Sequence, residues 1–495
     1  MRRRSAAALC ALALLLAGCQ TPSLGGASAE TPTEAGQSTP DEVVTLEVRN
    51  GTLTETGDAE RVPDDPGTDR LGWEGGYWHN ESLDVDRSDG LNESEREAVV
   101  NRSMARVEYI RGLEFESSVP VEVISRAEYR ENSSGEYGPS LRAFDNAKFE
   151  ALFLIGEDED SIEVQESTLG SSVLGYYSPS EDAIVIVSDS ETPTIAEGTL
   201  GHELVHALQD QRFGLNSTAA TRDGVQGRNG LIEGDASAVD DSYGERCGEQ
   251  WECLSGSGGG GASGDRHAGV SFMLFFPYSD GTTFVSALRD RGGWSAVDDA
   301  YADLPDGSRE VTHPEDYPDW EPRNVTMPAE PGGDWKRVRP SSDRDRPDYA
   351  TVGPSAIAAS MAYTLSDGYN RSAVVTSREI LNYGEDGTVD SADPYNYALA
   401  GTRGWEGGRM HVYTNGPEDG YVWRTVWTDD VAAERFAERW GDVVEHWGGT
   451  QTGENTWVIA DDSPFADAVA IHVSGDTVTV VNAPTEGQLT ELYDA

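Results

Sequence analysis

The 495-residue chain carries 89 acidic residues against 36 lysines and arginines, so its formal net charge is −53. A surface this negative repels other polyanions, so we expect neither nucleic acid nor an anionic membrane surface as a partner. The length predicts roughly two or three domains. Lys148 and Lys336 are the only lysines. Because molar salt shortens the Debye length to about 3 Å and screens self-repulsion, this composition predicts an extreme halophile, an archaeon.

The N-terminus has the features of an exported lipoprotein. Arginines at residues 2–4 precede an apolar run, and Leu16-Ala17-Gly18-Cys19 matches a lipobox. The run is too short to span a bilayer comfortably, so we interpret residues 1–18 as a signal peptide and Cys19 as the lipidated residue. Residues 19–45 are rich in Thr, Pro, Ser, Gly and Glu and predict a flexible tether. The protein is therefore expected on the cell surface, held to the membrane through its lipid only.

The first predicted elements of the folded part alternate between helix and strand. Apolar spacing predicts a helix over residues 94–112, then a strand over residues 119–124 and a helix from Ser125. The β-branched run Ala183-Ile184-Val185-Ile186-Val187 predicts another strand.

The most informative segment is His202-Glu203-Leu204-Val205-His206. Thr194 and Glu197 form a predicted capping box ahead of it, and Gly214 is the predicted end of its helix. Histidines four apart project from one helix face, so both can bind one zinc ion while Glu203 acts as general base on a water molecule. The alternative is a core helix with two hydrogen-bonded histidines, which would leave the Glu203 carboxylate half-buried without a partner.

A third zinc ligand is expected downstream, in the helix-like segment around Gly230-Leu231-Ile232-Glu233-Gly234. A carboxylate on a second helix, reached after a loop, completes a His-His-Glu site in which one position stays open. The alternative is that Glu233 belongs to an ordinary acidic helix start.

Together these residues resemble the gluzincin branch of zinc metallopeptidases. The matching segments are His202-Glu203-Leu204-Val205-His206-Ala207-Leu208-Gln209-Asp210-Gln211 and Glu233-Gly234-Asp235-Ala236. The chain looks like a group of extracytoplasmic zincin-like proteins that includes haloarchaeal surface lipoproteins, in which a Gly-Tyr-Tyr-x-Pro turn and a strand precede the motif. Residues 175–179 and 183–187 match that turn and strand. The resemblance covers most of the chain beyond residue 90.

The resemblance implies that His202, His206 and Glu233 bind zinc and that Glu203 is the general base. It also implies that the strand over residues 183–187 borders the cleft, where it either pairs with an extended peptide or serves as a plain core strand.

One position departs from the thermolysin-like pattern. Those enzymes place an Asp four residues after the ligand Glu as a partner for a histidine, and this chain has Ser237 there. Asp235 or Asp240 is expected to replace that Asp. The sequence identifies no transition-state donor, and the candidates are Tyr243, His267 and His313, each with a structural role as the default.

Two covalent modifications are predicted in the folded part. Cys247 and Cys253 are expected to form a short-loop disulfide outside the cell, followed by a mobile Gly-rich loop over residues 256–264. Glycosylation sequons on an exported protein are candidate glycan sites. They begin at Asn80, Asn92, Asn101, Asn132, Asn216, Asn324 and Asn370.

The expected fold is α+β in two units. A zincin-like domain over residues 46–334, with a mixed sheet and the metal helices, ends with helical patterns over residues 270–302. A smaller α+β domain over residues 335–495 follows. Its expected helices cover residues 355–365 and 431–446, the second burying Val431, and its strands cover residues 410–413, 421–427, 456–459, 468–472 and 477–481.

The leading functional hypothesis is a lipid-anchored zinc peptidase that acts on extracellular proteins or peptides. The runner-up is a zincin-fold surface protein that binds a partner without turnover. A substrate-binding lipoprotein ranks third, because the usual paired α/β lobes are not apparent. The sequence leaves the substrate and the oligomeric state open.

Overall fold

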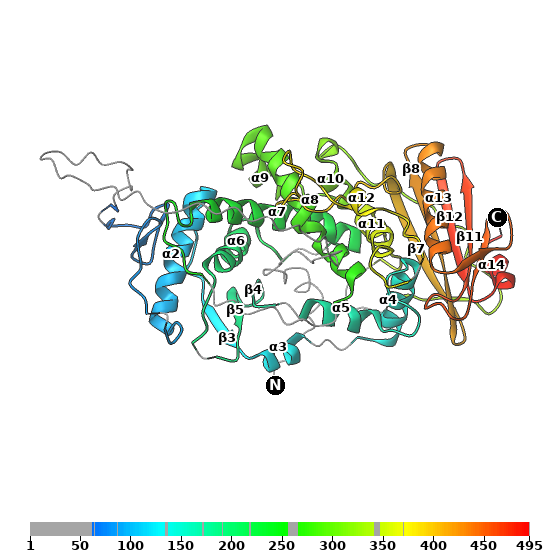
Figure 1. Ribbon diagram of the computed structural model, residues 1–495, viewed down its shortest axis with the longest axis horizontal. Helices are drawn as coiled ribbons and strands as arrows, with labels where there is room; N and C mark the ends of the chain where they lie inside the picture. Colours follow the sequence, from blue (N-terminus) through cyan, green and yellow to red (C-terminus); the bar gives the residue numbers. More distant parts are fainter. Residues whose placement is uncertain are drawn as a thin grey trace, which may run out of the picture.

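The computed structural model describes residues 62–63, 65–86, 88–133, 137–170, 173–190, 192–216, 219–255, 266–340, 347–369 and 371–494. The predicted signal peptide, Cys19, the tether, the Gly-rich loop and Asn370 lie outside the described residues. The chain combines many helices with separate three-stranded and seven-stranded sheets (Figure 1), so the predicted α+β class is confirmed. None of the described helices is both long enough and apolar enough to cross a membrane.

A three-stranded mixed sheet lies beside the motif helix. β5 (Ala183–Val187) pairs in parallel with β3 (Val121–Ile124) and antiparallel with β4 (Gly175–Ser178). β5 is therefore the central strand, and all five of its residues are buried. The prediction that β5 pairs with an extended peptide is wrong, because strands on both sides already occupy its edges. The plain core strand is the correct alternative, and the predicted turn at residues 175–179 forms the edge strand β4.

Four helices enclose the motif: α2 (Glu93–Arg111), α6 (Glu197–Phe213), α7 (Arg222–Arg246) and α8 (Ala268–Gly292). α7 and α8 pack backbone to backbone. A Cβ atom at Gly234 would lie 2.1 Å from the carbonyl oxygen of Gly281, and one at Gly281 would lie 2.5 Å from that of Gly230. Glycine permits this close approach because it lacks a side chain. The short separation brings both helices to the motif.

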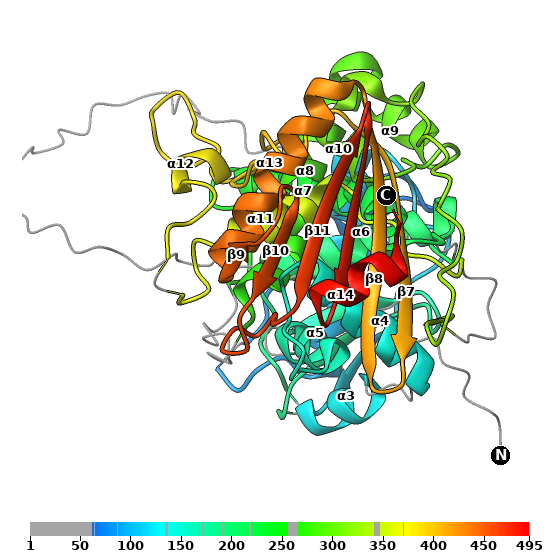
Figure 2. The same ribbon diagram turned by 90° about the vertical axis from the view of Figure 1, so that its right-hand side faces the viewer.

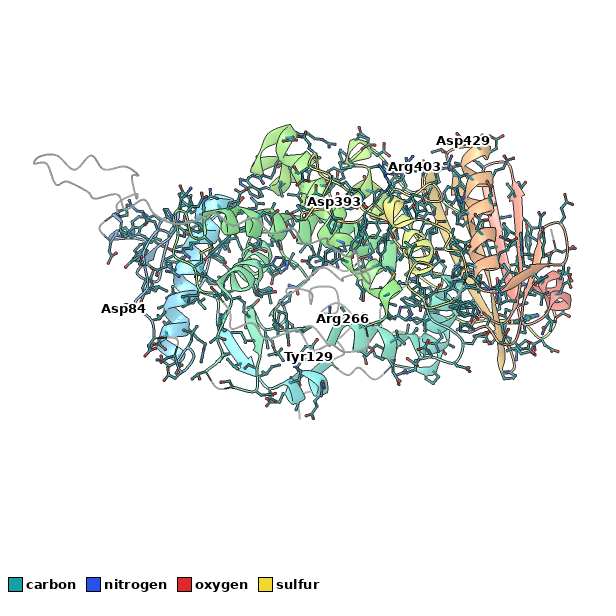
Figure 3. All side chains as sticks on the ribbon, viewed as in Figure 1. Asp84, Tyr129, Arg266, Asp393, Arg403 and Asp429 are labelled. Carbon is teal, nitrogen blue, oxygen red and sulfur yellow. A yellow bond between two sulfur atoms is a disulfide. The ribbon has the colours of Figure 1, made fainter. Side chains whose placement is uncertain are left out.

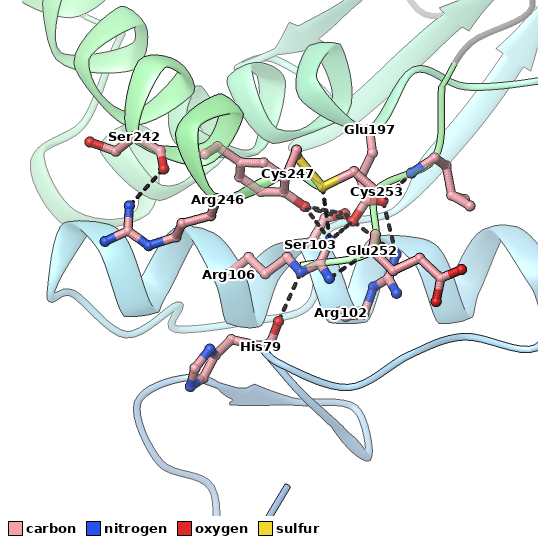
Figure 4. The surroundings of a disulfide bond; sticks show 12 residues. His79, Arg102, Ser103, Arg106, Glu197, Ser242, Arg246, Cys247, Glu252 and Cys253 are labelled. Atoms are coloured by element: carbon pink, nitrogen blue, oxygen red, sulfur yellow. Dashed lines mark hydrogen bonds and ion pairs between the residues drawn. A yellow bond between two sulfur atoms is a disulfide. The ribbon is translucent and has the colours of Figure 1, made fainter. Parts of the chain in front are cut away.

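Buried ion pairs hold the first turn of α6 against α2, as Figure 4 shows. Glu197 accepts hydrogen bonds from Arg102 Nη2 at 2.8 Å and from the Tyr243 hydroxyl at 2.7 Å, and it also pairs with Arg106. The predicted capping box of Thr194 and Glu197 is wrong: the residue before the helix is Ala196, without a side-chain cap. The Glu197 carboxylate instead neutralises two arginines that would otherwise be buried without a counter-charge.

The predicted disulfide between Cys247 and Cys253 is present, with an S–S distance of 2.05 Å. It lies at the end of α7, and Arg106 Nη1 contacts the sulfur of Cys253. The crosslink therefore fixes the chain that leaves α7 against the buried arginines of α2.

The C-terminal part is a seven-stranded antiparallel sheet in the order β6-β7-β8-β12-β11-β10-β9 (Figure 2). Helix α13 (Asp430–His446) covers the inner face and α14 (Glu486–Leu492) the outer face. α13 buries Phe436, Trp440 and Val443, but Val431 is 61% exposed, so its predicted burial is wrong. Val431 lies on the side of the first turn that faces away from the core, whereas the next two residues, Ala432 and Ala433, are buried in it. The strands are Lys336–Arg337, Trp405–Asn415, Glu418–Trp427, Gly449–Gln451, Thr456–Ile459, Ala468–Ser474 and Thr477–Ala483 for β6 to β12.

Shorter elements connect these parts, and Figure 3 shows the side chains on the ribbon. Asp393, labelled there, accepts hydrogen bonds from Ser279 and Thr283 of α8. The largest buried apolar cluster contains α8 residues as well as Trp423 and Trp440 of the C-terminal part. The remaining elements are β1 (Trp73–Glu74), β2 (Tyr77–Trp78), α3 (Arg126–Ser133), α4 (Pro139–Ala151), α5 (Ser161–Gly170), α9 (Trp294–Ala300), α10 (Ser308–Thr312), η1 (Pro314–Asp316), α11 (Pro354–Tyr363) and α12 (Ser377–Ile380).

Candidate metal centre

Three predicted ligands converge on one point between α6 and α7. His202 Nε2 and His206 Nε2 each lie 3.3 Å from the same Glu233 oxygen, Oε2. All three side chains are buried, and their ligand atoms lie within 4.8 Å of one another. Glu233 sits in the middle of the 25-residue helix α7, so the alternative that it belongs to an acidic helix start is wrong. The structure therefore brings together residues that the sequence separates by a loop.

These separations fit a tetrahedral ion. Ligands at Zn–N and Zn–O distances near 2.0 Å are separated by about 3.3 Å along a tetrahedron edge. Glu233 Oε1 and Glu203 Oε1 are buried and have no hydrogen-bond partner among the described residues. Such atoms are rarely left unsatisfied in a folded protein. Two imidazoles and a carboxylate form a donor set suited to zinc, so the residues present fit the predicted ion.

Glu233 and His206 shift each other's pKa against the effect of burial. Burial alone would lower the pKa of His206, but the charge and hydrogen bond of Glu233 raise it to about 9. Burial alone would raise the pKa of Glu233, but His206 and His202 lower it to about 2. Each group therefore favours the charged form of the other, and a metal ion would compete with protons for the same ligand atoms.

Glu203 is held beside this group by the sheet. Its side chain is 1% exposed, and its Oε2 accepts a 2.8 Å hydrogen bond from the backbone N–H of Tyr177 in β4. Burial raises the pKa of Glu203 to about 7, against the opposing effect of the two histidines. A carboxylate with a pKa near neutrality can both accept and return a proton, as a general base requires.

The predicted departure at Ser237 is resolved by a residue that the sequence reasoning missed. His206 Nδ1 lies 2.9 Å from Gln209 Oε1, and Gln209 Nε2 donates to Asp235 Oδ2 at 3.2 Å and to Ile232 O at 2.9 Å. Since the amide oxygen can only accept, His206 carries its proton on Nδ1 and turns Nε2 toward Glu233. Asp235 therefore supports His206 through Gln209, one step further away than a direct carboxylate partner.

Asp235 is itself fixed by a buried cation. Arg111 donates to Asp235 at 2.8 Å and to Asp298 at 2.6 Å, and the Tyr301 hydroxyl donates to Asp235 at 2.8 Å. These partners come from α2 and α9 and from the residue after α9, far from the motif in sequence, so no local pattern indicates them. Gln209 was detectable, because it follows His206 by three residues on the same helix.

The other predicted partner, Asp240, lies near His202. Burial raises the pKa of Asp240, and the proximity of His202 opposes that shift. No hydrogen bond joins their described side chains, so Asp240 neighbours the histidine without orienting it through a direct contact.

The structure places the three candidate donors elsewhere. Tyr243 donates to Glu197 in the α2 network, His267 caps α8 through its Nδ1, and His313 pairs with Glu315. A residue that the sequence reasoning missed, Tyr278 of α8, lies over His202 instead, with nearly parallel rings and centroids 6.3 Å apart. No sequence motif surrounds Tyr278 on this long helix, so the sequence did not indicate that it lies near His202.

A cavity of about 200 Å³ opens between α4, α5, α7 and α8. Its wall includes Asn229, one helical turn before Glu233 on α7, and Pro277, the residue before Tyr278. Apolar side chains of α4 and α5 line the opposite side. The cavity therefore shares both of its central helices with the candidate metal centre.

The predicted glycosylation positions have different environments. Asn92 caps α2 by accepting from the backbone N–H groups of Ser94 and Glu95, and Asn101 is half-buried beside Gly75. Asn80 is also half-buried. Four positions are exposed: Asn92, Asn132, Asn216 and Asn324.

Comparisons with known proteins concern the C-terminal part. The family described as "Domain of unknown function (DUF8575)" matches residues 337–493, a range that contains none of the three candidate ligands. No curated protein and no solved structure matches the chain.

Proposed function

We propose that this protein is a zinc-dependent peptidase with a zincin-like site, exported and held at the cell surface by a lipid on Cys19. One observation carries the proposal: the Nε2 atoms of two helical histidines each lie 3.3 Å from one oxygen of Glu233, beside the buried carboxylate of Glu203. Extracellular protein or peptide is the proposed substrate class.

His202, His206 and Glu233 would hold the ion. When bound, zinc supplies a Lewis acid that polarises a carbonyl group and increases the acidity of water. Glu203 accepts the proton of the attacking water and then returns it to the leaving amine. The Tyr177 N–H keeps one Glu203 oxygen in place, which leaves Oε1 available for this transfer.

The residues around the ligands have proposed positioning roles. Gln209 fixes the tautomer of His206, and the Arg111–Asp235 pair holds Gln209. The Tyr278 hydroxyl is the proposed donor to the oxygen that becomes negative in the transition state, because its ring lies near the ligand His202. The cavity beside Asn229 is the proposed pocket for a substrate side chain.

The test is peptide cleavage by the mature protein in concentrated salt. One zinc ion per chain is expected by metal analysis, together with turnover of a broad peptide library. Glu203→Gln is expected to retain the zinc and to lose at least about a thousandfold in kcat, since the proton acceptor is gone. Glu434→Gln, the same change at an exposed position of α13, is the matched control and should retain full activity.

A zinc-loaded protein that cleaves nothing and behaves identically as Glu203→Gln would overturn the peptidase proposal. That outcome would favour a binding protein with the same site. A protein without stoichiometric zinc would overturn both.

A further inference from the structure

A second group of potential ligands lies on the C-terminal sheet. In antiparallel strands, directly opposed residues face the same side, and so do residues two apart on one strand. Asn482 of β12 is opposite Tyr421 of β8 and Val469 of β11. Asp419 and Asp467 lie two positions from Tyr421 and Val469, respectively. The register therefore places both aspartates and Asn482 on one face, the inner one, where Val469 and Tyr421 join the main core.

The end of α4 and the loop after it bring two glutamates to this face. Glu150 is 7% exposed, and one carboxylate oxygen each from Glu150, Glu157 and Asp467 lie within 4.8 Å of one another. The loop is seated closely: Glu157 N donates to Pro464 O at 3.0 Å, and a Cβ atom at Gly156 would lie 2.7 Å from the Pro464 side chain. The close approach is possible because residue 156 is glycine.

The residues around Glu150 are acidic side chains that would repel one another when ionised. The charged side chains that act most strongly on Glu150 are Asp467, Asp419 and Glu157, all of them acids. Burial and these neighbours raise the pKa of Glu150 well above its usual range, and that of Asp467 to about 8. Unlike the buried acids of the α2 network, these carboxylates have no arginine facing them among their strongest interactions.

Asn482 provides the independent sign of a ligand. Its side chain is 4% exposed, and its amide nitrogen donates a hydrogen bond to Asp467, so the amide lies at the border of the group. Its Oδ1 is buried and has no hydrogen-bond partner among the described residues. A buried amide oxygen without a donor, on a side chain that contacts one of the clustered carboxylates, can act as an oxygen ligand for a hard cation.

We propose that Glu150, Glu157, Asp467 and the Asn482 amide oxygen bind a calcium ion between α4 and the C-terminal sheet. The donor set contains oxygen only, which favours calcium over zinc, and the multiple carboxylates and flexible geometry suit calcium better than magnesium. Asp419 contributes further negative charge. Glu157, exposed at the rim, gives the ion a way in from solvent. Bound calcium joins the loop after α4 to β11 and β12.

The experiment uses calcium itself and the full mature chain with zinc already bound. After removal of calcium with EGTA, calcium is titrated calorimetrically in about 2 M KCl, where monovalent salt suppresses loose binding to surface acids. Terbium luminescence, excited through aromatic side chains such as the nearby Tyr421, reports occupancy separately. The test variants are Glu150→Gln combined with Asp467→Asn, and Asn482→Leu alone. The matched control is Asp280→Asn, another buried acid with a raised pKa.

One tight calcium site is expected in the wild type and in Asp280→Asn. Each test variant should bind at least about tenfold more weakly, because affinity follows the charge and number of oxygen ligands. Calcium should also raise the Tm of the wild type but not that of the double variant. Circular dichroism identifies any variant that fails to fold. If the double variant does not fold, the calcium affinity of Asn482→Leu tests the site. Equal calcium binding by wild type and both test variants, or no binding above the weak surface background, overturns the site.

Discussion

Two buried ligand groups in this chain differ in how their charges are compensated. At the candidate metal centre, two imidazoles face Glu233, and Gln209, Asp235 and Arg111 form a connected chain behind them. At the sheet, the carboxylates of Glu150, Glu157 and Asp467 face one another. The first group can be stabilised by one shared proton. The second needs protons or a cation, because like charges in a low-dielectric interior repel strongly.

Both groups are largely buried, so the chemistry of the ligand atoms, and not burial, determines which ion each group is proposed to bind. Nitrogen and oxygen ligands at tetrahedral spacing favour zinc, whereas carboxylates with one amide oxygen favour calcium. The two sites should therefore respond independently to substitutions and to chelators.

The largest expected effect comes from removing one ligand of the first group. His206→Ala should lower zinc affinity by at least about a thousandfold, since two protein ligands no longer close the site. Calcium binding should stay within about twofold of the wild type, because the two groups share no residue. Zinc competition with a chromophoric chelator and calcium calorimetry measure the two affinities. Parallel loss of both metals would show that the two groups are not independent.

The next effect concerns Tyr278. Tyr278→Phe should reduce kcat about a hundredfold with little change in KM or zinc affinity, because a single transition-state donor is lost while the ring remains. Steady-state kinetics on one peptide substrate measure this. Tyr363→Phe, on α11 against His267, is the control for loss of a hydroxyl elsewhere. An unchanged kcat in Tyr278→Phe would remove Tyr278 from the mechanism.

A smaller effect is expected from Gln209, which contacts the ligand His206 and does not itself bind the ion. Gln209→Leu should weaken zinc binding about 10- to 100-fold, because His206 loses the acceptor that fixes its tautomer. Gln209→Glu keeps an acceptor and should restore most of the affinity. Chelator competition at constant pH measures both variants. If leucine and glutamate behave alike, Gln209 fills space and does not orient the histidine.

The smallest expected effect concerns a pair of acids that belongs to neither ligand group. Glu108 and Glu74 contact each other, and mainly burial raises their pKa values to about 9 and about 7. Among the described residues, this pair belongs to neither group of three or more clustered ligand atoms. The folded state holds protons that the unfolded chain has released above about pH 4.5. Stability is therefore expected to fall as pH rises from about 5 to about 9.

Glu108→Gln should reduce this pH dependence, and calcium should not alter it. Thermal melts at pH 5 and pH 9, with and without calcium, give the comparison. A variant whose Tm falls as steeply with pH as that of the wild type would show that Glu108 is ionised in the folded protein.

Local patterns predicted the elements whose apolar spacing is regular. The helix expected over residues 94–112 is Glu93–Arg111, and the strand expected over residues 456–459 is Thr456–Ile459. α7 was longer than expected, because its five glycines argue against a helix of 25 residues. The structure explains two of them: Gly234 packs against Gly281 of α8, and Gly227 packs against Gly307. The capping box failed because Glu197 bonds to arginines of another helix.

The sequence by itself determined the helical His202-Glu203-x-x-His206 face, the candidate ligand Glu233 and the Cys247–Cys253 bridge, because each depends on spacing along the chain. The tertiary structure was needed to show that Asp235 and Arg111 hold Gln209 against the histidine, and that Glu150, Asp467 and Asn482 meet on one face of the sheet. Those contacts join helices and strands up to 332 residues apart in a chain of 495. Strand register and helix packing set them, and neither leaves a local pattern.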